Sequence, residues 1–194
     1  MIGKSSMKQR LILETALKLM FEGFYEDATI ESVSSYTQLD TEKIRQYYTT
    51  DENLRMSAMK YAAIVWVEQV KVDLEKQESK KDKLYALIRH YIAGSESYPQ
   101  SLSLYVDIWK KIRDIKTEDR QLLSNELFKI YRYYVRFFQE AMKDIYTNES
   151  RYDMEQLAWI MVVMSDGFHV QSLIQSQQID FDRITQTFYQ MLEL

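Results

Sequence analysis

The sequence contains no cysteine, and glycine and proline are scarce, with four and one respectively among 194 residues. Without cysteine, neither disulfides nor thiolate metal sites hold the chain together, which suits a reducing compartment such as the cytoplasm. Sheet proteins need many turns that favour glycine and proline, so their scarcity disfavours a sheet. No apolar run approaches the ~20 residues of a membrane-spanning helix, and the N-terminus lacks the apolar core of a signal peptide. We therefore expect a cytoplasmic protein without membrane contact.

The residues found throughout the chain, among them Leu, Lys, Glu, Gln, Met and Ala, favour helices. Their pattern predicts an all-α protein of about nine helices. A chain of this length suits one large domain or a small domain joined to a larger one, and it is long enough to bury a sizeable core.

The first part of the chain is expected to hold three short helices and one long helix. Thr29 and Asp40 are the expected N-caps of the second and third helices. The spacing of Thr49 and Glu52 suits a capping box for the fourth. The expected helices span residues 6–24, 30–36, 41–48 and, starting at residue 50 or 51, reach residue 77.

The charged stretch KQESKKDK, residues 76–83, is expected to form a hinge. Beyond it the apolar spacing predicts longer helices, of which three begin after the N-cap residues Thr117, Asp153 and Asp180. These helices are expected over residues 82–97, 102–115, 118–146, 153–176 and 180–192.

Three short helices joined by tight turns and followed by a long helix describe a helix-turn-helix module. Residues 12–54, ILETALKLMFEGFYEDATIESVSSYTQLDTEKIRQYYTTDENL, resemble the DNA-binding domain of TetR-family transcriptional regulators. The rest of the chain matches that family only in its general plan. The resemblance is carried by the joint spacing of Ala16, Leu19, Met20, Tyr25, Thr29, Ile30, Val33, Leu39, Ile44, Tyr47, Tyr48, Glu52 and Leu54.

The resemblance implies a helix-turn-helix DNA-binding domain over residues 1–50 and a helical effector-binding and dimerisation domain over residues 51–194, which begins with the long helix 51–77. It implies a homodimeric, ligand-responsive transcriptional regulator, most often a repressor, that binds a double-stranded DNA operator with palindromic half-sites. The residues expected to face DNA are Thr29, Gln38, Thr41, Glu42, Lys43, Arg45, Gln46 and Tyr47.

Several positions depart from the family pattern. The family usually has glycine at the positions of Phe24, Gln38 and Glu42, lysine at the position of Asp51, and tyrosine at the position of Arg45. Gln38 lies in the turn between the two helices of the motif, where glycine eases a positive φ. Glycine at the position of Glu42 lets the backbone approach the phosphates.

The predicted module is acidic for a DNA-binding domain. Residues 1–60 contain nine Asp and Glu against eight Lys and Arg. Neutralisation of DNA phosphates by Lys and Arg supplies most non-specific DNA affinity. Because its acids outnumber its bases, this module offers few such contacts. Asp40, as an N-cap, has its charge engaged at a helix N-terminus, and Asp51 and Glu52 can play the same role in the following helix.

Glu42 has no such structural role. It can accept a hydrogen bond from a cytosine amine, pair with Arg45 or Lys43, or repel DNA. Arg45 can bind guanine through two hydrogen bonds, the commonest specific contact to a base. A basic N-terminal arm (Lys4, Lys8 and Arg10) and uncharged phosphate donors (Thr29, Thr41 and Tyr47) add positioning contacts. The alternative function is a dimeric small-molecule-binding or protein-interaction module whose acidic helix-turn-helix no longer binds DNA.

The segment LAWIMVVM, residues 157–164, is apolar around the full circumference of a helix, so two of its sides need cover. One side can serve the core of its own subunit, and a second subunit can cover the other. Gly167 follows at a position where close approach of another backbone would offset its low helix propensity. The residues expected at the dimer interface are Trp159, Val163, Gly167, Val170, Phe181, Ile184 and Phe188.

The helices between residues 102 and 138 are rich in aromatic rings. Each ring alone is more simply a core residue, but together they favour an apolar pocket for a hydrophobic or aromatic small-molecule effector. The expected pocket residues are Tyr105, Trp109, Phe128, Tyr131, Tyr134, Phe138, Met161 and Met164. An effector there is expected to act through the hinge and the long helix 51–77.

No pattern in the sequence indicates an enzyme. The two histidines, His90 and His169, lie far apart in the sequence and have no metal-ligand spacing. A phosphate-cradling glycine loop and a dinucleotide fingerprint are both missing. No catalytic residue, metal site or cofactor is therefore expected.

Overall fold

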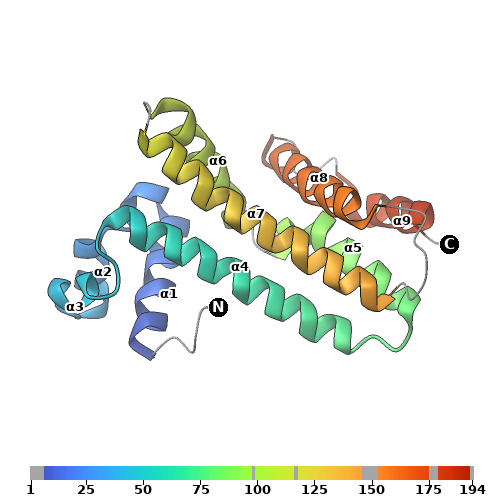
Figure 1. Cartoon of the computed structure of the whole chain (residues 1–194), viewed down its shortest axis with the longest axis horizontal. Helices are drawn as coiled ribbons and strands as arrows, with labels where there is room; N and C mark the ends of the chain where they lie inside the picture. Colours follow the sequence, from blue (N-terminus) through green and yellow to red (C-terminus); the bar gives the residue numbers. More distant parts are fainter. Residues whose placement is uncertain (1–6, 98, 116–117, 146–152, 175–178, 193–194) are drawn as a thin grey trace. The chain divides into compact units, whose positions relative to one another are not determined.

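The computed structural model describes residues 7–97, 99–115, 118–145, 153–174 and 179–192, and every regular element in these residues is a helix (Figure 1). The all-α prediction is confirmed. The elements are α1 (Met7–Glu22), the 3-10 helix η1 (Tyr25–Asp27), α2 (Ile30–Thr37), α3 (Thr41–Arg45), α4 (Asp51–Glu75), α5 (Lys80–Ser97), α6 (Pro99–Asp114), α7 (Glu118–Ile145), α8 (Met154–Ile174) and α9 (Phe181–Leu192). Among the helices of these ranges, none has the length and apolarity needed to cross a membrane.

The chain divides into two compact units. The first unit combines the N-terminal residues up to Ile64 with Ser103–Leu127, so most of α6 and the start of α7 belong to it. The second unit combines Val65–Leu102 with the residues from Phe128 onward. Helices α4 and α7 therefore each contribute to both units.

In the first unit, α1 packs against η1 and α2, and α2 packs against α3. Their apolar residues recur at helical spacing, so each short helix buries one face. Complete burial of such a side chain stabilises the fold by about 1.5–3 kcal/mol. The most deeply buried side chains include Ile12, Ala16, Met20, Tyr25, Ile30, Val33, Ile44 and Leu54.

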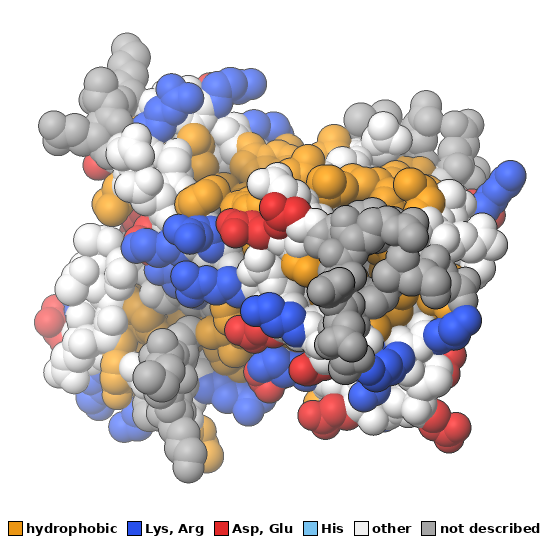
Figure 2. Space-filling model, turned by 45° about the vertical axis from the view of Figure 1, so that its right-hand side comes forward, with side chains coloured by type: hydrophobic (Ala, Val, Ile, Leu, Met, Phe, Trp, Pro, Cys, Tyr) orange, Lys and Arg blue, Asp and Glu red, His pale blue; other side chains and the backbone are white. Residues whose placement is uncertain are grey.

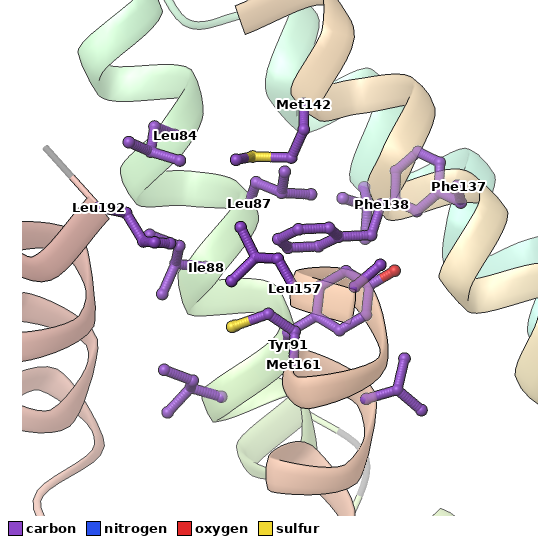
Figure 3. Close-up of a cluster of buried hydrophobic side chains, with 14 of the residues drawn as sticks. Leu84, Leu87, Ile88, Tyr91, Phe137, Phe138, Met142, Leu157, Met161 and Leu192 are labelled. Carbon is purple, nitrogen blue, oxygen red and sulfur yellow. The ribbon is translucent and has the colours of Figure 1, made fainter. Parts of the chain in front are cut away.

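In the second unit, α5 packs against α8 and α9. Figure 3 shows the buried side chains that α5, α7 and α8 direct toward one another. Leu87, Ile88 and Tyr91 come from α5, Phe138 and Met142 from α7, and Leu157 and Met161 from α8. The core of this unit is thus a single contiguous cluster.

Four predicted N-caps are correct. Side-chain oxygens of Thr29, Asp40, Asp153 and Asp180 accept hydrogen bonds from backbone N–H groups in the first turns of α2, α3, α8 and α9. The predicted capping box at Thr49 is wrong, because Thr50 Oγ1 accepts from Asn53 N at 3.1 Å instead. Thr117 lies outside the described residues.

Among the helix boundaries that differ from the prediction, three have a clear structural reason. Helix α3 ends at Arg45, because Tyr47 N and Tyr48 N both donate to Ile44 O and close the last turn. Helix α5 begins at Lys80, inside the predicted hinge, because Ser79 Oγ accepts from Asp82 N at 3.1 Å. Helix α6 begins at Pro99, where the fixed φ of proline suits a first helical position.

Candidate functional site

Two independent caps fix the N-terminus of α2. Thr29 Oγ1 accepts from Ser32 N at 3.0 Å, and Ser32 Oγ accepts from Thr29 N at 2.9 Å. From the start of α4, Asp51 Oδ1 accepts from Ile30 N at 2.8 Å. Asp51 therefore caps α2 across the fold, and not its own helix as the sequence suggested. The positions of α2 and α4 are coupled through this contact.

The turn between α2 and α3 passes through Gln38, which has φ 57° and ψ 22°. Gln38 is the only non-glycine residue with positive φ in the described part of the chain, as expected at a position where the family has glycine. Ser34 Oγ donates to Leu39 O at 2.6 Å and closes the turn. The turn sets the direction in which α3 leaves α2.

Helix α3, which corresponds to the reading helix of the resembled family, is anchored by Ile44 and by Tyr48 just beyond its end, both buried. Its other side chains reach the surface. Gln38, Glu42, Lys43, Arg45, Gln46 and Tyr47 are exposed, and Thr29 and Thr41 are half-buried. The residues predicted to face DNA thus all lie at the start of α2, in the turn, or on and directly after α3.

Among the acids of residues 39–54, Asp40 and Asp51 accept backbone N–H groups at helix starts. Glu52 instead accepts hydrogen bonds from the Tyr25 hydroxyl and from Lys111 Nζ. Glu42 is exposed, and its carboxylate has no ion-pair or hydrogen-bond partner among the described residues. The acidity of this segment is therefore largely engaged within the fold, with Glu42 as the exception.

Arg45 does not pair with Glu42, which was one of the predicted alternatives. Its Nη2 donates to Glu31 Oε1 at 2.7 Å, across from α3 to the first turn of α2. Glu31 could not be identified from the sequence as the partner of Arg45, because the two residues are 14 positions apart and no helical spacing links them.

The described residues of the predicted basic N-terminal arm are helical and do not form an extended arm. Lys4 lies outside the described residues, and Lys8 and Arg10 belong to α1. Arg10 Nε donates to Glu14 Oε1 at 2.8 Å within that helix. This hydrogen bond holds the pKa of Glu14 below its usual value. The guanidinium of Arg10 is thus committed to an intrahelical ion pair.

A cluster of charged residues connects η1, α4 and α6 within the first unit. Arg55 is buried, its Nε donates to Ala28 O at 3.1 Å, and its Nη1 contacts Glu26 and Glu52. Lys111 Nζ lies 2.5 Å from Glu26 Oε1 and 2.6 Å from Glu52 Oε2.

Tyr25 completes this cluster. Its hydroxyl donates to Glu52, and the cations of Arg55 and Lys111 lie over its ring at 5.3 and 5.1 Å from the centroid. Burial raises the pKa of Tyr25 far above its usual range, so the hydroxyl keeps its proton. Sequence spacing could not show this cluster, because its members come from three separate elements.

The predicted pocket residues fall into both units. Tyr105 and Trp109 belong to the first unit, whereas the other members belong to the second. Phe138 and Met161 are buried in the core cluster, and Tyr131 and Tyr134 pack against it. Met164 is half-buried, and Phe128 is exposed.

Aromatic rings in the second unit pack mainly edge to face. The ring of Trp66 meets those of Tyr91 and Tyr134 at centroid distances of 5.3 and 5.2 Å. Tyr91 also meets Phe138 at 5.1 Å, and its hydroxyl donates to Tyr134 O at 2.7 Å. Trp66 was not among the predicted pocket residues, because it lies outside the aromatic-rich segment 102–138.

Asp166 on α8 was likewise not identified from the sequence. Burial raises its pKa to about 6, and the Tyr131 hydroxyl beside it acts in the opposite direction.

His90 Nε2 lies 3.5 Å from Asp73 Oδ2, and burial lowers the pKa of His90. No cluster of three metal-ligating side chains occurs among the side chains that the structure describes.

Helix α8 has two apolar sides in the single chain. Leu157, Ala158, Met161 and Val162 are buried, whereas Ile160 and Val163 are 50% and 64% exposed. The Trp159 ring stacks on Phe128 with centroids 5.6 Å apart and an interplanar angle of 15°. Gly167 is exposed, and Val170 is half-buried. Figure 2 shows a face of the molecule on which hydrophobic side chains gather among charged ones.

The remaining predicted interface residues lie on α9. Phe181 is buried in the core of the second unit, and Ile184 and Phe188 pack against that core. Little of Phe181 is therefore left for a partner.

Comparison with solved structures identifies the fold. A TetR transcription regulator from Haloarcula marismortui aligns with a TM-score of 0.71 and 14% identity over 96% of each chain. The regulator FadR from Bacillus subtilis, solved with stearoyl-CoA, aligns with a TM-score of 0.69 and 12% identity over 94% of this chain and 96% of its own. A putative transcriptional regulator from Saccharomonospora viridis, solved with choline, gives 0.64 and 17% over 97% of each chain.

The chain therefore has the fold of TetR- and FadR-type regulators along nearly its whole length. No family model matches the sequence, and no curated protein matches it significantly. At these identities the likeness is one of fold.

Proposed function

We propose that the protein is a homodimeric, ligand-responsive transcriptional regulator that binds operator DNA through α3 and acts as a repressor. The observation that carries this proposal is the geometry of the α2–α3 module. Helix α3 is anchored by the buried Ile44 and presents Lys43, Arg45 and Gln46 to solvent. An exposed second helix of this kind is the element that enters the major groove in helix-turn-helix proteins.

The engagement of the acids supports DNA binding by an acidic module. A carboxylate that accepts backbone N–H groups at a helix start has part of its charge balanced by the helix dipole. Asp40 and Asp51 have this role, and the charge of Glu52 is balanced by Arg55 and Lys111. The field that DNA meets is therefore less negative than the residue count implies.

The exposed apolar side of α8 supports a two-fold dimer. Ile160, Val163 and Gly167 lie about one turn apart along α8, and all are exposed in the single chain. Clusters of exposed large apolar side chains mark interaction sites. A second copy of the same helix, packed across Gly167, would cover them and place two reading helices on one DNA duplex.

A small-molecule effector is proposed for the second unit. The relative with stearoyl-CoA and the relative with choline have this fold. Tyr131, Tyr134, Phe138 and Met161 lie in or against the core of this unit. Met164 lies half-buried on α8, and a ligand that enters between α7 and α8 would contact this group. An effector acts only if it binds the DNA-competent and DNA-incompetent conformations with unequal affinity.

DNA binding is tested by a mobility-shift assay at low salt with DNA that flanks the gene of this protein. Glu42→Gly in α3 removes the one reading-helix carboxylate without a partner, and we expect it to bind DNA more tightly than the wild type. We expect about a 3–10-fold increase, since removal of one unbalanced charge near phosphates is worth about 1 kcal/mol. Lower affinity of Glu42→Gly would instead show that the acid contacts a base.

One observation favours a second candidate function, in which the module no longer binds DNA. Glu42 stands exposed on the reading helix with no partner among the described residues. In this case the protein is a dimeric small-molecule-binding or protein-interaction module. The same assay decides, because that function requires that neither the wild type nor Glu42→Gly shifts any duplex at low salt.

A further inference from the structure

The guanidinium of Arg45 is paired before any DNA is present. Its Nη2 donates to Glu31 Oε1 at 2.7 Å, while the Arg45 and Glu31 side chains are 42% and 61% exposed. The pair thus lies at the surface that α3 would present to a duplex. A guanidinium has more N–H donors than one carboxylate oxygen uses, so donors remain for a further acceptor.

Both partners stand on well-fixed elements. The start of α2, which carries Glu31, is capped by Thr29 and by Asp51. The Ser34–Leu39 hydrogen bond closes the turn that leads to α3, which carries Arg45. An ion pair with both side chains this exposed adds little to the stability of the fold. While this pair is formed, it restricts the directions in which the long Arg45 side chain can point.

We propose that Glu31 is a specificity-determining residue, which directs Arg45 toward a guanine base edge and away from phosphate. This inference rests on the proposed DNA-binding function. Guanine presents two neutral acceptors, O6 and N7, which the spare donors of a paired guanidinium can bind while the bond to Glu31 persists. A phosphate contact gains most of its energy from charge, which Glu31 already balances.

The alternative contact is unfavourable for a second reason. If Arg45 turned to a phosphate, Glu31 would be left unpaired beside a polyanion. Removal of the Glu31 charge should therefore release Arg45 for phosphate contacts, which carry no sequence information. The proposal predicts that Glu31 lowers the affinity for arbitrary DNA and raises the discrimination at one base pair.

The test uses the full chain and fluorescence anisotropy with two labelled duplexes. One is the tightest-binding fragment of the DNA flanking its gene, together with versions in which each G·C pair is replaced in turn, and the other is a scrambled duplex. The variants are Glu31→Gln, Arg45→Ala, Arg45→Lys and the double variant E31Q/R45A. Glu22→Gln is the matched control, because Glu22 is an exposed carboxylate on α1 that pairs with Lys18.

For Glu31→Gln we expect about 3–10-fold tighter binding to the scrambled duplex. The binding constant should also fall more steeply with salt concentration, by the equivalent of about one phosphate contact. The preference for guanine at one position should fall at least several-fold. Arg45→Ala and Arg45→Lys should lose the same preference, since lysine lacks the planar fork, and the double variant should match Arg45→Ala. Glu22→Gln should leave both the preference and the salt dependence unchanged.

Two results would overturn the inference alone. In one, the wild type binds its fragment selectively and Glu31→Gln keeps the same guanine preference and salt dependence. In the other, Glu22→Gln changes them as much as Glu31→Gln, which would reduce the effect to net charge. If no variant and not even the wild type binds any duplex at low salt, both the proposed function and this inference are wrong.

Discussion

At the scale of single residues, Gln38 holds the turn of the helix-turn-helix module in a left-handed backbone conformation, with φ 57°. This conformation costs a residue with a Cβ atom about 1–2 kcal/mol, and glycine avoids most of that cost. We therefore expect Gln38→Gly to raise the free energy of unfolding by about 1 kcal/mol, as measured by urea denaturation.

The control for this substitution is Gln69→Gly, at an exposed position inside α4. Glycine in the interior of a helix is destabilising by about 1 kcal/mol, so this variant should lose stability. If both variants lose stability to the same extent, the strain assigned to Gln38 is not present.

Asp166 gives a prediction about pH. Burial raises the pKa of Asp166 in the folded protein from 3.8 to about 6. Between about pH 4 and pH 6, the folded protein therefore holds a proton that the unfolded chain releases. The stabilising effect of this proton is complete below about pH 4 and is lost as the pH rises through about 6. Asp166→Asn, which needs no proton, should therefore be more stable than the wild type at pH 7 by about 1–2 kcal/mol.

Urea denaturation between pH 4 and pH 7 measures this difference. The gain in stability of Asp166→Asn over the wild type should grow with pH across this window. Asp144→Asn, on the exposed side of α7, serves as the control and should not show such a trend. A constant difference between Asp166→Asn and the wild type would contradict the assigned burial of the charge.

At the scale of elements, the charged cluster joins α6 to η1 and α4 within the first unit. Lys111 Nζ contacts Glu26 and Glu52 and lies over the Tyr25 ring. Lys111→Met keeps most of the side-chain volume but leaves Arg55 as the only cation of the cluster that pairs with the two carboxylates. Since both glutamates are partly exposed, we expect a loss of about 1–2 kcal/mol in the free energy of unfolding.

The neighbouring Lys110 provides the matched control, because it is 61% exposed and meets Asp107 only at 3.7 Å. Lys110→Met should change the stability by less than about 0.5 kcal/mol. Equal losses in the two variants, measured by urea denaturation, would mean that the cluster contributes nothing beyond a surface charge.

The same scale shows which features a sequence reveals. The N-caps Thr29, Asp40, Asp153 and Asp180 could be predicted, because a cap and its helix are adjacent in the chain. Asp51 was assigned to the wrong helix, because its partner Ile30 N is 21 positions away. Arg55 and Lys111 were not linked to Glu26, since such contacts depend on how helices pack and not on spacing within one helix.

At the scale of the whole molecule, periodicity predicted that α8 has two apolar sides but could not assign every aromatic residue to one role. Phe128 was predicted in the pocket and Trp159 at the dimer interface, yet their rings stack on each other at 5.6 Å. Tyr105 and Trp109 fall in the first unit, although they were grouped with residues of the second. Assignment to a unit depends on contacts between distant segments, which a single sequence does not display.

The proposed dimer can be tested at Gly167, where an added Cβ would meet no heavy atom within 4 Å among the described residues outside its own helix backbone. Gly167→Leu should therefore leave each subunit folded, and the better helix propensity of leucine adds about 0.8 kcal/mol to its stability. If a second α8 packs across Gly167, the new side chain must separate the two backbones. We expect the dissociation constant of the dimer to rise at least about tenfold, by sedimentation velocity across a concentration series.

Lys143→Leu places the same leucine side chain at an exposed position of α7 and should leave the dissociation constant unchanged. A wild-type protein that remains a single subunit at about 10 μM would contradict the proposed dimer, since a stable homodimer should persist at that concentration. In that case a lone α3 would meet only one half-site, and the affinity gained from two linked reading helices would be lost. If Gly167→Leu keeps its fold but binds DNA more weakly, the loss of affinity comes from separation of the two subunits, because Gly167 lies on α8 and not on the DNA-binding module.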